Sequence, residues 1–203
     1  LMPRLHLFYE AHPEIDLSVS TNPARANFVE DKVNLAVRFG TGKFPGLVTI
    51  PLMPLSVFPV CSPKLLAKGQ LRYPDDIRHH VLLHDESLAK DPSCPSWTQW
   101  CSINEVGGFD ARRGPRVDHA YLAIDAAIAG RGIAMGRSAL VAEDIKAGRL
   151  VRPFENSYQG KCAYFIVYPE ETSQSRTTET FSNWLMQQVT QERLSERGFR
   201  RVP

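Results

Sequence analysis

The side chains of this sequence that could bind a small polar molecule stand where predicted strands end. Two alternating runs, residues 15–20 and 33–40, carry them: Thr21 and Asn22 follow the first, and Arg38, Phe39 and Gly40 close the second. In open α/β sheets, ligands bind beyond the carboxyl ends of such strands. Hydroxyl and amide groups can both donate and accept hydrogen bonds there, and a glycine lets the backbone approach a ligand closely. The two runs therefore predict a ligand-binding unit.

Arg38 and Ser62 each allow a binding role and a structural one. A guanidinium at a strand end could clamp a carboxylate with paired hydrogen bonds, but Arg38 could equally form an ion pair with an acid such as Asp31, which we favour. Ser62 precedes Pro63 at a predicted helix start, where free N–H groups can bind an anion. Ordinary helix capping is the interpretation we favour for Ser62.

Neither a metal centre nor a catalytic group is indicated. His79, His80 and His84 tempt a metal interpretation, but two adjacent histidines point in opposite directions and no further ligands accompany them. The sequence contains no nucleophile elbow, phosphate-binding loop or dinucleotide-binding glycine motif. We therefore expect no enzyme activity, no metal and no cofactor.

The cysteines favour reduced thiols. Cys61, Cys94, Cys101 and Cys162 show neither C-x-x-C pairing nor metal-ligand spacing. Cys61 and Cys162 fall on two predicted crossing strands, so a redox-sensitive disulfide is conceivable. Two buried, unreactive cysteines are the interpretation we favour, because nothing in the sequence indicates a depressed thiol pKa.

Composition limits the class of protein. The chain has 203 residues, 43% of them hydrophobic, which is enough for a real core. Its net charge of +2, from 24 Lys and Arg against 22 Asp and Glu, gives no reason to expect that this chain grips DNA. No run is long and apolar enough to cross a membrane, and the start lacks a signal-peptide pattern, so we expect a cytoplasmic protein.

The first half of the chain predicts a helix, two strands and a long extended segment. A helix over residues 1–11 precedes a strand at 15–20, a helix starting near Pro23 and a strand over 33–40. The run 47–60 is extended but contains Pro51, Pro54 and Pro59, which confine it to an edge or a crossing strand.

The second half alternates between helices and strands. We expect helices at 63–69, 120–130, 138–148 and 176–192, strands at 81–84, 132–135, 150–154 and 163–168, and Trp97 and Trp100 as core residues on a helical turn. Such alternation favours parallel sheets with right-handed crossovers. Two extended segments, 47–60 and 150–168, flank a block with its own strands and helices, which indicates two lobes joined by two crossing strands.

Several segments in order carry a family resemblance. They include PRLHLFYEAHPEIDL at the start, VNLAVRFG at 33–40, PVCSP at 59–63, LLH at 82–84, the pair Trp97 and Trp100, GRLVRPF at 148–154 and FSNWL at 181–185. Over essentially the whole chain, the sequence resembles the effector-binding domain of LysR-type transcriptional regulators. Within that family it is most similar to the glycine-cleavage activators and β-lactamase regulators.

The resemblance implies an α/β fold of the type II periplasmic-binding-protein class, with two Rossmann-like lobes that close on a ligand held between them. It places lobe I at residues 1–59 plus 161–190, lobe II at 60–160 and a C-terminal tail at 191–203. The family's winged helix-turn-helix and the first strand of lobe I would lie outside this sequence.

The resemblance also implies ligand contacts, which we expect at Thr21, Asn22, Asn27, Asp118, His119 and Tyr164. Asn27 and Asn34 stand where relatives carry aspartate, so this wall of the site is less negative than the family pattern. We therefore expect it to accommodate an effector carrying a carboxylate more easily than one carrying a cation, and Asn27 in place of aspartate argues against a muropeptide effector.

The function hypothesis is an effector-binding domain that senses a small metabolite and relays it to DNA-binding modules outside this chain. The resemblance implies a homodimer, or a tetramer of the longer protein, with the helix at 4–11 of one subunit against the second lobe of its partner. DNA would be contacted only through the N-terminal domain, and no membrane is involved. The alternatives are a free-standing solute-binding protein of the same fold and an interaction domain with a vestigial cleft.

Overall fold

A computed structural model describes residues 1–20, 28, 30–67, 71–88, 96–172 and 175–199. The chain folds into two compact units: unit 1 consists of residues 1–53 and 163–203, and unit 2 of residues 54–162. Two strands cross the boundary between them, β2 (Leu47–Val60) and β6 (Tyr158–Pro169). The two predicted crossing strands are thereby confirmed, and each unit has its own hydrophobic core.

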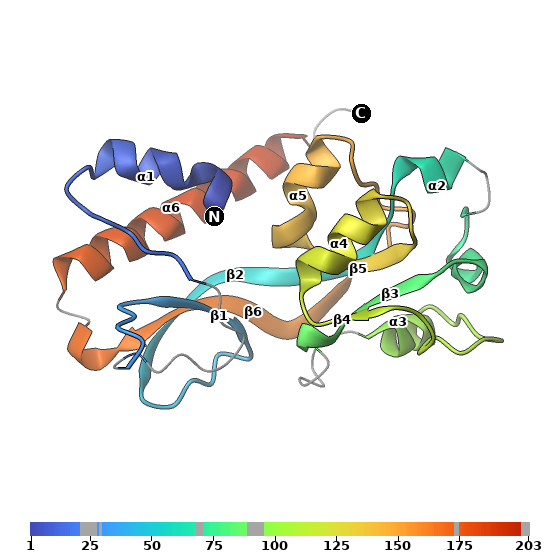
Figure 1. Ribbon diagram of the computed structural model, residues 1–203, viewed down its shortest axis with the longest axis horizontal. Helices are drawn as coiled ribbons and strands as arrows, with labels where there is room; N and C mark the ends of the chain where they lie inside the picture. The colour runs from blue at the N-terminus through green and yellow to red at the C-terminus, as the bar shows by residue number, and fades with distance from the viewer. Residues whose placement is uncertain (21–27, 29, 68–70, 89–95, 173–174, 200–203) are drawn as a thin grey trace. The chain divides into compact units, whose positions relative to one another are not determined.

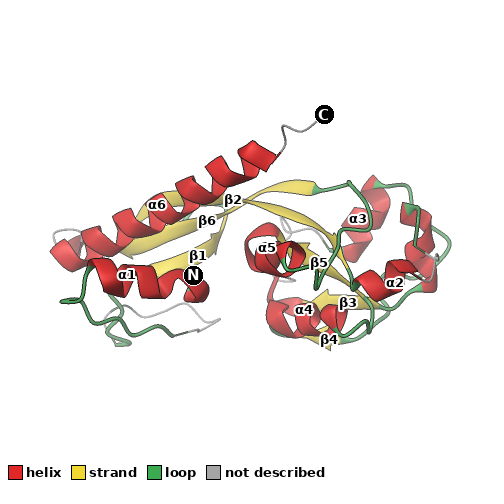
Figure 2. Cartoon of the chain, turned by 90° about the horizontal axis from the view of Figure 1, so that it is seen from above, coloured by secondary structure: helices red, strands yellow, loops and turns green. Residues whose placement is uncertain are grey.

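Unit 1 is built from a short sheet covered by two helices. Its helices are α1 (Leu5–Ala11), which follows the 3-10 turn Met2–Arg4, and α6 (Arg176–Phe199). Strand β1 (Ala36–Gly40) pairs antiparallel with β6, from Ala36 opposite Val167 to Gly40 opposite Ala163. Figures 1 and 2 both show α1 and α6 lying side by side. Their apolar faces meet the sheet through a cluster that contains Phe8, Leu52, Ile166 and Trp184.

Unit 2 has helices on both faces of its sheet. The strands are β3 (Leu82–Asp85), β4 (Arg116–Val117) and β5 (Ile133–Arg137), together with the second part of β2, in the order β2-β5-β3-β4. The helices are α2 (Pro63–Ala67), α3 (Trp97–Ile103), α4 (Ala120–Ile128) and α5 (Ser138–Lys146), and 3-10 turns span Pro74–His79, Glu86–Leu88 and, in unit 1, Glu170–Thr172.

Period-two alternation assigns the two faces of this sheet. Leu82 and Ile133 pack on the α3 side with Trp97 and Trp100, and both tryptophans are buried, as predicted. Their neighbours Leu83 and Ala134 pack on the other side with the alanine-rich face of α4 and with Val141 of α5. The Trp97 indole nitrogen donates to the Leu83 carbonyl at 3.0 Å, so the tryptophan anchors α3 to the sheet.

Strand directions correct part of the prediction. β5 runs parallel to β3, and β3 runs parallel to β4, as the alternation of strands and helices predicts. Two pairs that involve the crossing strands, β1 with β6 and β2 with β5, are antiparallel. The prediction of wholly parallel sheets is therefore wrong, because β6 brings the chain back into unit 1 against the direction of β1, and β2 enters unit 2 against β5.

Two predicted strands do not form. Residues 15–20 carry no strand pairing, and residues 150–154 contribute only one bridge, between Val151 and Cys61. Both segments alternate because one side packs on a core: Ile15 and Leu17 lie against the unit 1 cluster, and Leu150 is fully buried. Alternation of apolar residues indicates only an extended chain with one buried side. A strand also needs a neighbouring segment whose backbone groups are available for hydrogen bonds. The predicted strand at 33–40 begins only at Ala36.

Candidate functional site

The parallel strands of unit 2 end at one edge of the sheet. β3 ends at Asp85, β4 at Val117 and β5 at Arg137, and Asp85 lies opposite Val117 in the register. Carboxyl ends of parallel strands are the common ligand-binding edge of α/β sheets. Charged and polar side chains gather at this edge, which makes it the strongest candidate site that unit 2 offers by itself.

A nearly buried ion pair occupies this edge. Arg137 donates from Nη2 to the Asp85 carboxylate and, at 2.6 Å, to the Ser87 hydroxyl. The side chains of Arg137 and Asp85 are only 10% and 8% exposed. The Ser87 backbone N–H donates to Asp85 Oδ1 at 2.9 Å, so the carboxylate is held from two sides. The pair ties the end of β3 to the end of β5 and to the start of α5.

Sequence reasoning missed Arg137, Asp85 and Ser87. The signal was present, because Asp85 follows the buried residues Leu82 and Leu83, and Arg137 ends the run that starts at Ile133. Two opposite charges at the ends of neighbouring parallel strands meet at the same edge. Local patterns do not reveal that β3 pairs with β5, so they do not indicate that these side chains meet.

Two of the predicted ligand contacts, Asp118 and His119, lie at this same edge. They connect β4 to α4, and His119 Nδ1 stands 3.4 Å from Asp118 Oδ1. Both side chains are exposed, at 85% for Asp118 and 51% for His119, and no side-chain cap ties His119 to the first turn of α4. Their polar atoms are therefore accessible to a ligand.

Ser62 lies at the other edge of the unit 2 sheet. Because β2 runs antiparallel to β5, with Val60 opposite Ala134 and Val57 opposite Arg137, the end of β2 lies beside the start of β5. Ser62 is buried, and its backbone carbonyl accepts the first bond of the five-residue helix α2 from Leu65 N at 2.9 Å. The structure therefore does not bring Ser62 together with Asp118 and His119, and its ligand role stays a prediction.

In unit 1 the structure brings Phe39 and Tyr164 together. They are cross-strand partners on β1 and β6, and their rings make an edge-to-face contact with centroids 5.6 Å apart. Arg38 is half-buried beside them in the register, opposite Phe165, and Gly40 ends β1 opposite Ala163. The pairing of Arg38 with Asp31 stays a prediction. Thr21, Asn22 and Asn27 lie outside the described residues.

The cysteines and His84 have ordinary structural roles in the described part of the chain. Cys61, Cys101 and Cys162 are buried, and burial raises the pKa of the Cys61 thiol to about 11, so it stays protonated and unreactive near neutral pH. His84 Nε2 lies 3.1 Å from the Arg113 carbonyl. Within the described ranges, no group of three His, Cys, Asp or Glu side chains could hold a metal ion, and Cys94 falls outside them.

The fold and these polar strand ends define a two-lobed α/β ligand-binding domain. The chain belongs to the LysR family: the model of the LysR substrate binding domain matches residues 1–190. Among solved structures, the chain is similar to the effector domain of the transcriptional regulator AmpR of Pseudomonas aeruginosa. The TM-score is 0.79 at 24% identity, with 99% of this chain and 92% of that one covered. The AmpR effector binding domain of Citrobacter freundii gives a TM-score of 0.78 at 24% identity, covering 94% of this chain and 91% of that one.

Curated relatives are transcriptional regulators. The chain is 31% identical over 193 residues to the glycine cleavage system transcriptional activator of Escherichia coli K12, which covers 95% of this chain and 61% of that protein. It is 32% identical over 188 residues to the transcriptional activator AmpR of Rhodobacter capsulatus, covering 91% of this chain and again 61% of that protein. The chain thus spans about three fifths of the length of these relatives. None of its described helices is both long and apolar enough to span a lipid bilayer.

Proposed function

We propose that this chain is the effector-binding part of a cytoplasmic LysR-type transcriptional regulator and that it senses a small metabolite without transforming it. The observation that carries the proposal is the group of charged and polar side chains at the carboxyl edge of β3, β4 and β5, in a chain that belongs to this family. That edge is where α/β sheets of this kind bind ligands.

Each unit carries proposed ligand contacts of its own. Unit 1 would supply Arg38, Phe39, Gly40 and Tyr164, with Thr21, Asn22 and Asn27 added from the segment after residue 20. Unit 2 would supply Asp118 and His119, with Ser62 as an additional candidate. The Phe39–Tyr164 pair supports this assignment, because it offers an aromatic surface with one hydroxyl on the strand pair that also carries Arg38.

The proposed effector carries a carboxylate. Arg38 can bind a carboxylate with paired hydrogen bonds, whereas Asn27 and Asn34 are uncharged and would not repel it. A ligand can signal only if it binds one arrangement of the two units better than another. Such a shift would be passed to the DNA-binding modules of a longer protein, which would contact the operator.

A ligand screen by thermal denaturation tests this function. We expect at least one small carboxylate from a library of amino acids, aromatic acids and other organic acids to raise the melting temperature in a concentration-dependent way, since ligands that bind only the native state stabilise it. Muropeptides should give no rise. If no compound in the library shifts the melting temperature, the alternative of an interaction domain with a vestigial cleft is favoured instead.

Three variants test the site with any carboxylate so found. Tyr164→Phe and Thr21→Ala should each weaken its binding by about tenfold, the usual cost of one lost hydrogen bond to a charged group. Tyr168→Phe is the matched control, because Tyr168 lies on the same strand and packs against the same unit 1 core cluster as Tyr164, but is not a proposed ligand contact. Unchanged affinity in both site variants would show that the ligand binds elsewhere.

We also propose that the chain forms a homodimer through α1. The helix and the residues before it expose apolar side chains, with Met2 64% and Leu7 40% accessible, which supports burial of this surface by a partner. Sedimentation velocity should show a dimer that Leu7→Lys converts to monomer. Ile103→Lys is the control, because Ile103 is an apolar residue on α3 of unit 2 that is even more exposed, at 60%. A monomer at all accessible concentrations would refute the dimer.

A further inference from the structure

Unit 2 contains an open pocket on the α3 side of its sheet. It has a volume of about 580 Å³ and lies between α3 and the loop that follows it, residues 106–112. This volume is within the range of small-molecule sites, roughly 300–1,000 Å³. Thr98, Cys101 and Ser102 line it from one face of α3, at the spacing that places side chains together on a helix. None of the residues that we assign to the effector site lines this pocket.

The floor of the pocket is apolar and uncharged. Val106 and Ala111 line it beside Cys101, and all three belong to the core cluster around Trp100, with Phe109 packed against the same cluster. Burial raises the pKa of the Cys101 thiol to about 11, so the thiol is neutral at physiological pH. An apolar group placed on this floor loses contact with water and meets no charge.

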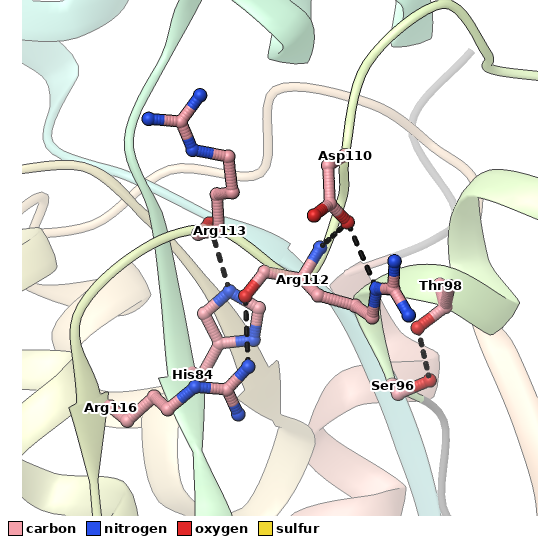
Figure 3. A network of polar contacts seen from close by, with 7 residues as sticks. All are labelled: His84, Ser96, Thr98, Asp110, Arg112, Arg113 and Arg116. Carbon is pink, nitrogen blue, oxygen red and sulfur yellow. Dashed lines mark hydrogen bonds and ion pairs between the residues drawn. The ribbon is translucent and has the colours of Figure 1, made fainter.

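The rim of the pocket carries one negative and one positive side chain next to each other. Arg112 donates to Asp110 Oδ1 from Nε at 3.0 Å and from its backbone N–H at 3.1 Å. These hydrogen bonds lower the pKa of the Asp110 carboxyl, with the side-chain bond contributing most, so Asp110 is ionised at neutral pH. Figure 3 shows the Arg112 guanidinium beside Thr98.

Both charged groups keep binding capacity for a ligand. Within the described chain, Asp110 Oδ2 accepts no side-chain or backbone hydrogen bond, and the two terminal nitrogens of Arg112 donate none. The two side chains are 45% and 74% exposed, so a ligand can reach them. The Thr98 hydroxyl lies next to the guanidinium and adds a further hydrogen-bonding group.

The loop that carries the rim is held in place from several directions. Arg116 Nη2 donates to the Arg112 carbonyl at 2.9 Å, and the His84 ring lies 3.1 Å from the Arg113 carbonyl. At Gly114 the backbone passes so close to β3 that a Cβ would lie 1.9 Å from the Leu82 carbonyl oxygen. A rim that is ordered before binding loses less entropy when a ligand binds.

We propose that this pocket binds a free α-amino acid with an apolar side chain, at a site separate from the effector site. The ammonium group would bind Asp110 Oδ2, the carboxylate would bind the terminal nitrogens of Arg112 and the Thr98 hydroxyl, and the side chain would lie on the floor of Cys101, Val106 and Ala111. A simple carboxylate would meet the charge of Asp110, and a simple amine would meet that of Arg112. Only a zwitterion satisfies both neighbours.

Calorimetric titration of the protein with L-leucine tests this proposal. We expect saturable binding of L-leucine. Two analogues should bind at least about tenfold more weakly: 4-methylpentanoate, which lacks the ammonium group, and 3-methylbutylamine, which lacks the carboxylate. L-serine should also bind more weakly, because it places no apolar group on the floor. Absence of binding by L-leucine, or equal binding by either single-charge analogue, would overturn the proposal.

Matched variants locate the binding. Arg112→Gln and Asp110→Asn should each weaken L-leucine binding by about tenfold. Arg113→Gln removes the same charge from the same loop, but Figure 3 shows its guanidinium pointing away from Asp110 and Arg112, so affinity should be unchanged. Tyr164→Phe, in the proposed effector site, should also leave L-leucine binding unchanged. If Arg112→Gln and Arg113→Gln weaken L-leucine binding equally, the binding depends only on the overall positive charge of the loop. If Tyr164→Phe weakens it, L-leucine binds at the effector site.

Discussion

Unit 2 contains two arginine–aspartate pairs that differ in almost everything except residue type. The pair of Arg137 and Asp85 joins the ends of two strands far apart in sequence, and its side chains are 10% and 8% exposed. The pair of Arg112 and Asp110 lies within one loop, and its side chains are 74% and 45% exposed. The first therefore interacts mainly with the protein, and the second keeps donors and an acceptor facing solvent.

The difference shows how burial decides what a charged pair does. Removing one member of a buried pair leaves the other charged and without water, which is costly. An exposed pair is screened by water and contributes little to stability, but its remaining hydrogen-bonding atoms are available to a ligand. We therefore expect Arg137 and Asp85 to be needed for the fold of the strand edge, and Arg112 and Asp110 to matter for binding.

The largest effect should come from breaking the buried pair. Arg137→Met should lower the free energy of unfolding by about 3–5 kcal/mol, because Asp85 would remain as a buried carboxylate without its guanidinium. Urea denaturation measures this loss. The double variant Arg137→Met with Asp85→Leu should recover most of it, since neither charge is then buried. A single variant as stable as the parent protein would show that the edge is hydrated in solution.

A smaller loss should follow from disturbing the loop that carries the exposed pair. Gly114→Ala should cost about 1–3 kcal/mol, because the added Cβ meets the Leu82 carbonyl and the backbone there has φ +141°. Gly107→Ala is the control, since nothing lies within 4 Å of a Cβ at that position. Thermal denaturation of the two variants should separate them clearly. If both melt like the parent, the loop is not held against β3.

The stability of the protein at alkaline pH should depend on the two buried thiols of unit 2. Burial raises the pKa of Cys61 and of Cys101 from 9.0 to about 11, so the folded state keeps its protons when the unfolded state loses them. Their stabilisation is complete below the unfolded pKa of about 9 and is lost as the pH rises towards about 11. The double variant Cys61→Ala with Cys101→Ala should show a shallower fall in melting temperature between these pH values. An identical slope would mean that the thiols do not contribute.

The smallest change in stability should come from breaking the exposed pair. Arg112→Gln should alter the free energy of unfolding by no more than about 0.5 kcal/mol, as is usual for surface substitutions, although it weakens L-leucine binding. Chemical denaturation of this variant beside Arg137→Met makes the comparison direct. A loss as large as that of Arg137→Met would show that the two pairs have the same structural role.

Most secondary structure followed from local patterns. The helices at 5–11, 120–128 and 138–146 carry apolar periodicity and recognisable ends, and Trp97 and Trp100 are buried as their spacing predicts. The last helix begins at Arg176 as predicted but continues to Phe199, beyond its predicted end at residue 192. The misassigned strands at 15–20 and 150–154 have the alternation of a strand but not its partner. Periodicity records which side of a segment is buried, and it contains no information about which backbone lies next to it.

The candidate site was predicted only in part for the same reason. Phe39 and Tyr164 are both predicted ligand contacts, and the register of β1 and β6 makes them neighbours. Arg137 and Asp85 were not named, because their relation depends on the parallel pairing of β3 with β5. Ser62 is also a predicted ligand contact, but the antiparallel direction of β2 takes it to the edge of the sheet opposite Asp118 and His119.

The sequence by itself determined the family, the α/β class, the two crossing strands and most of the helices, because these depend on local periodicity and on motifs in order along the chain. Tertiary structure alone decided which strand ends meet and which arginine–aspartate pair is buried. Those properties depend on distances between residues that are remote in sequence. Burial and strand direction, which set the energy of a charge and the edge it occupies, exist only once the chain has folded.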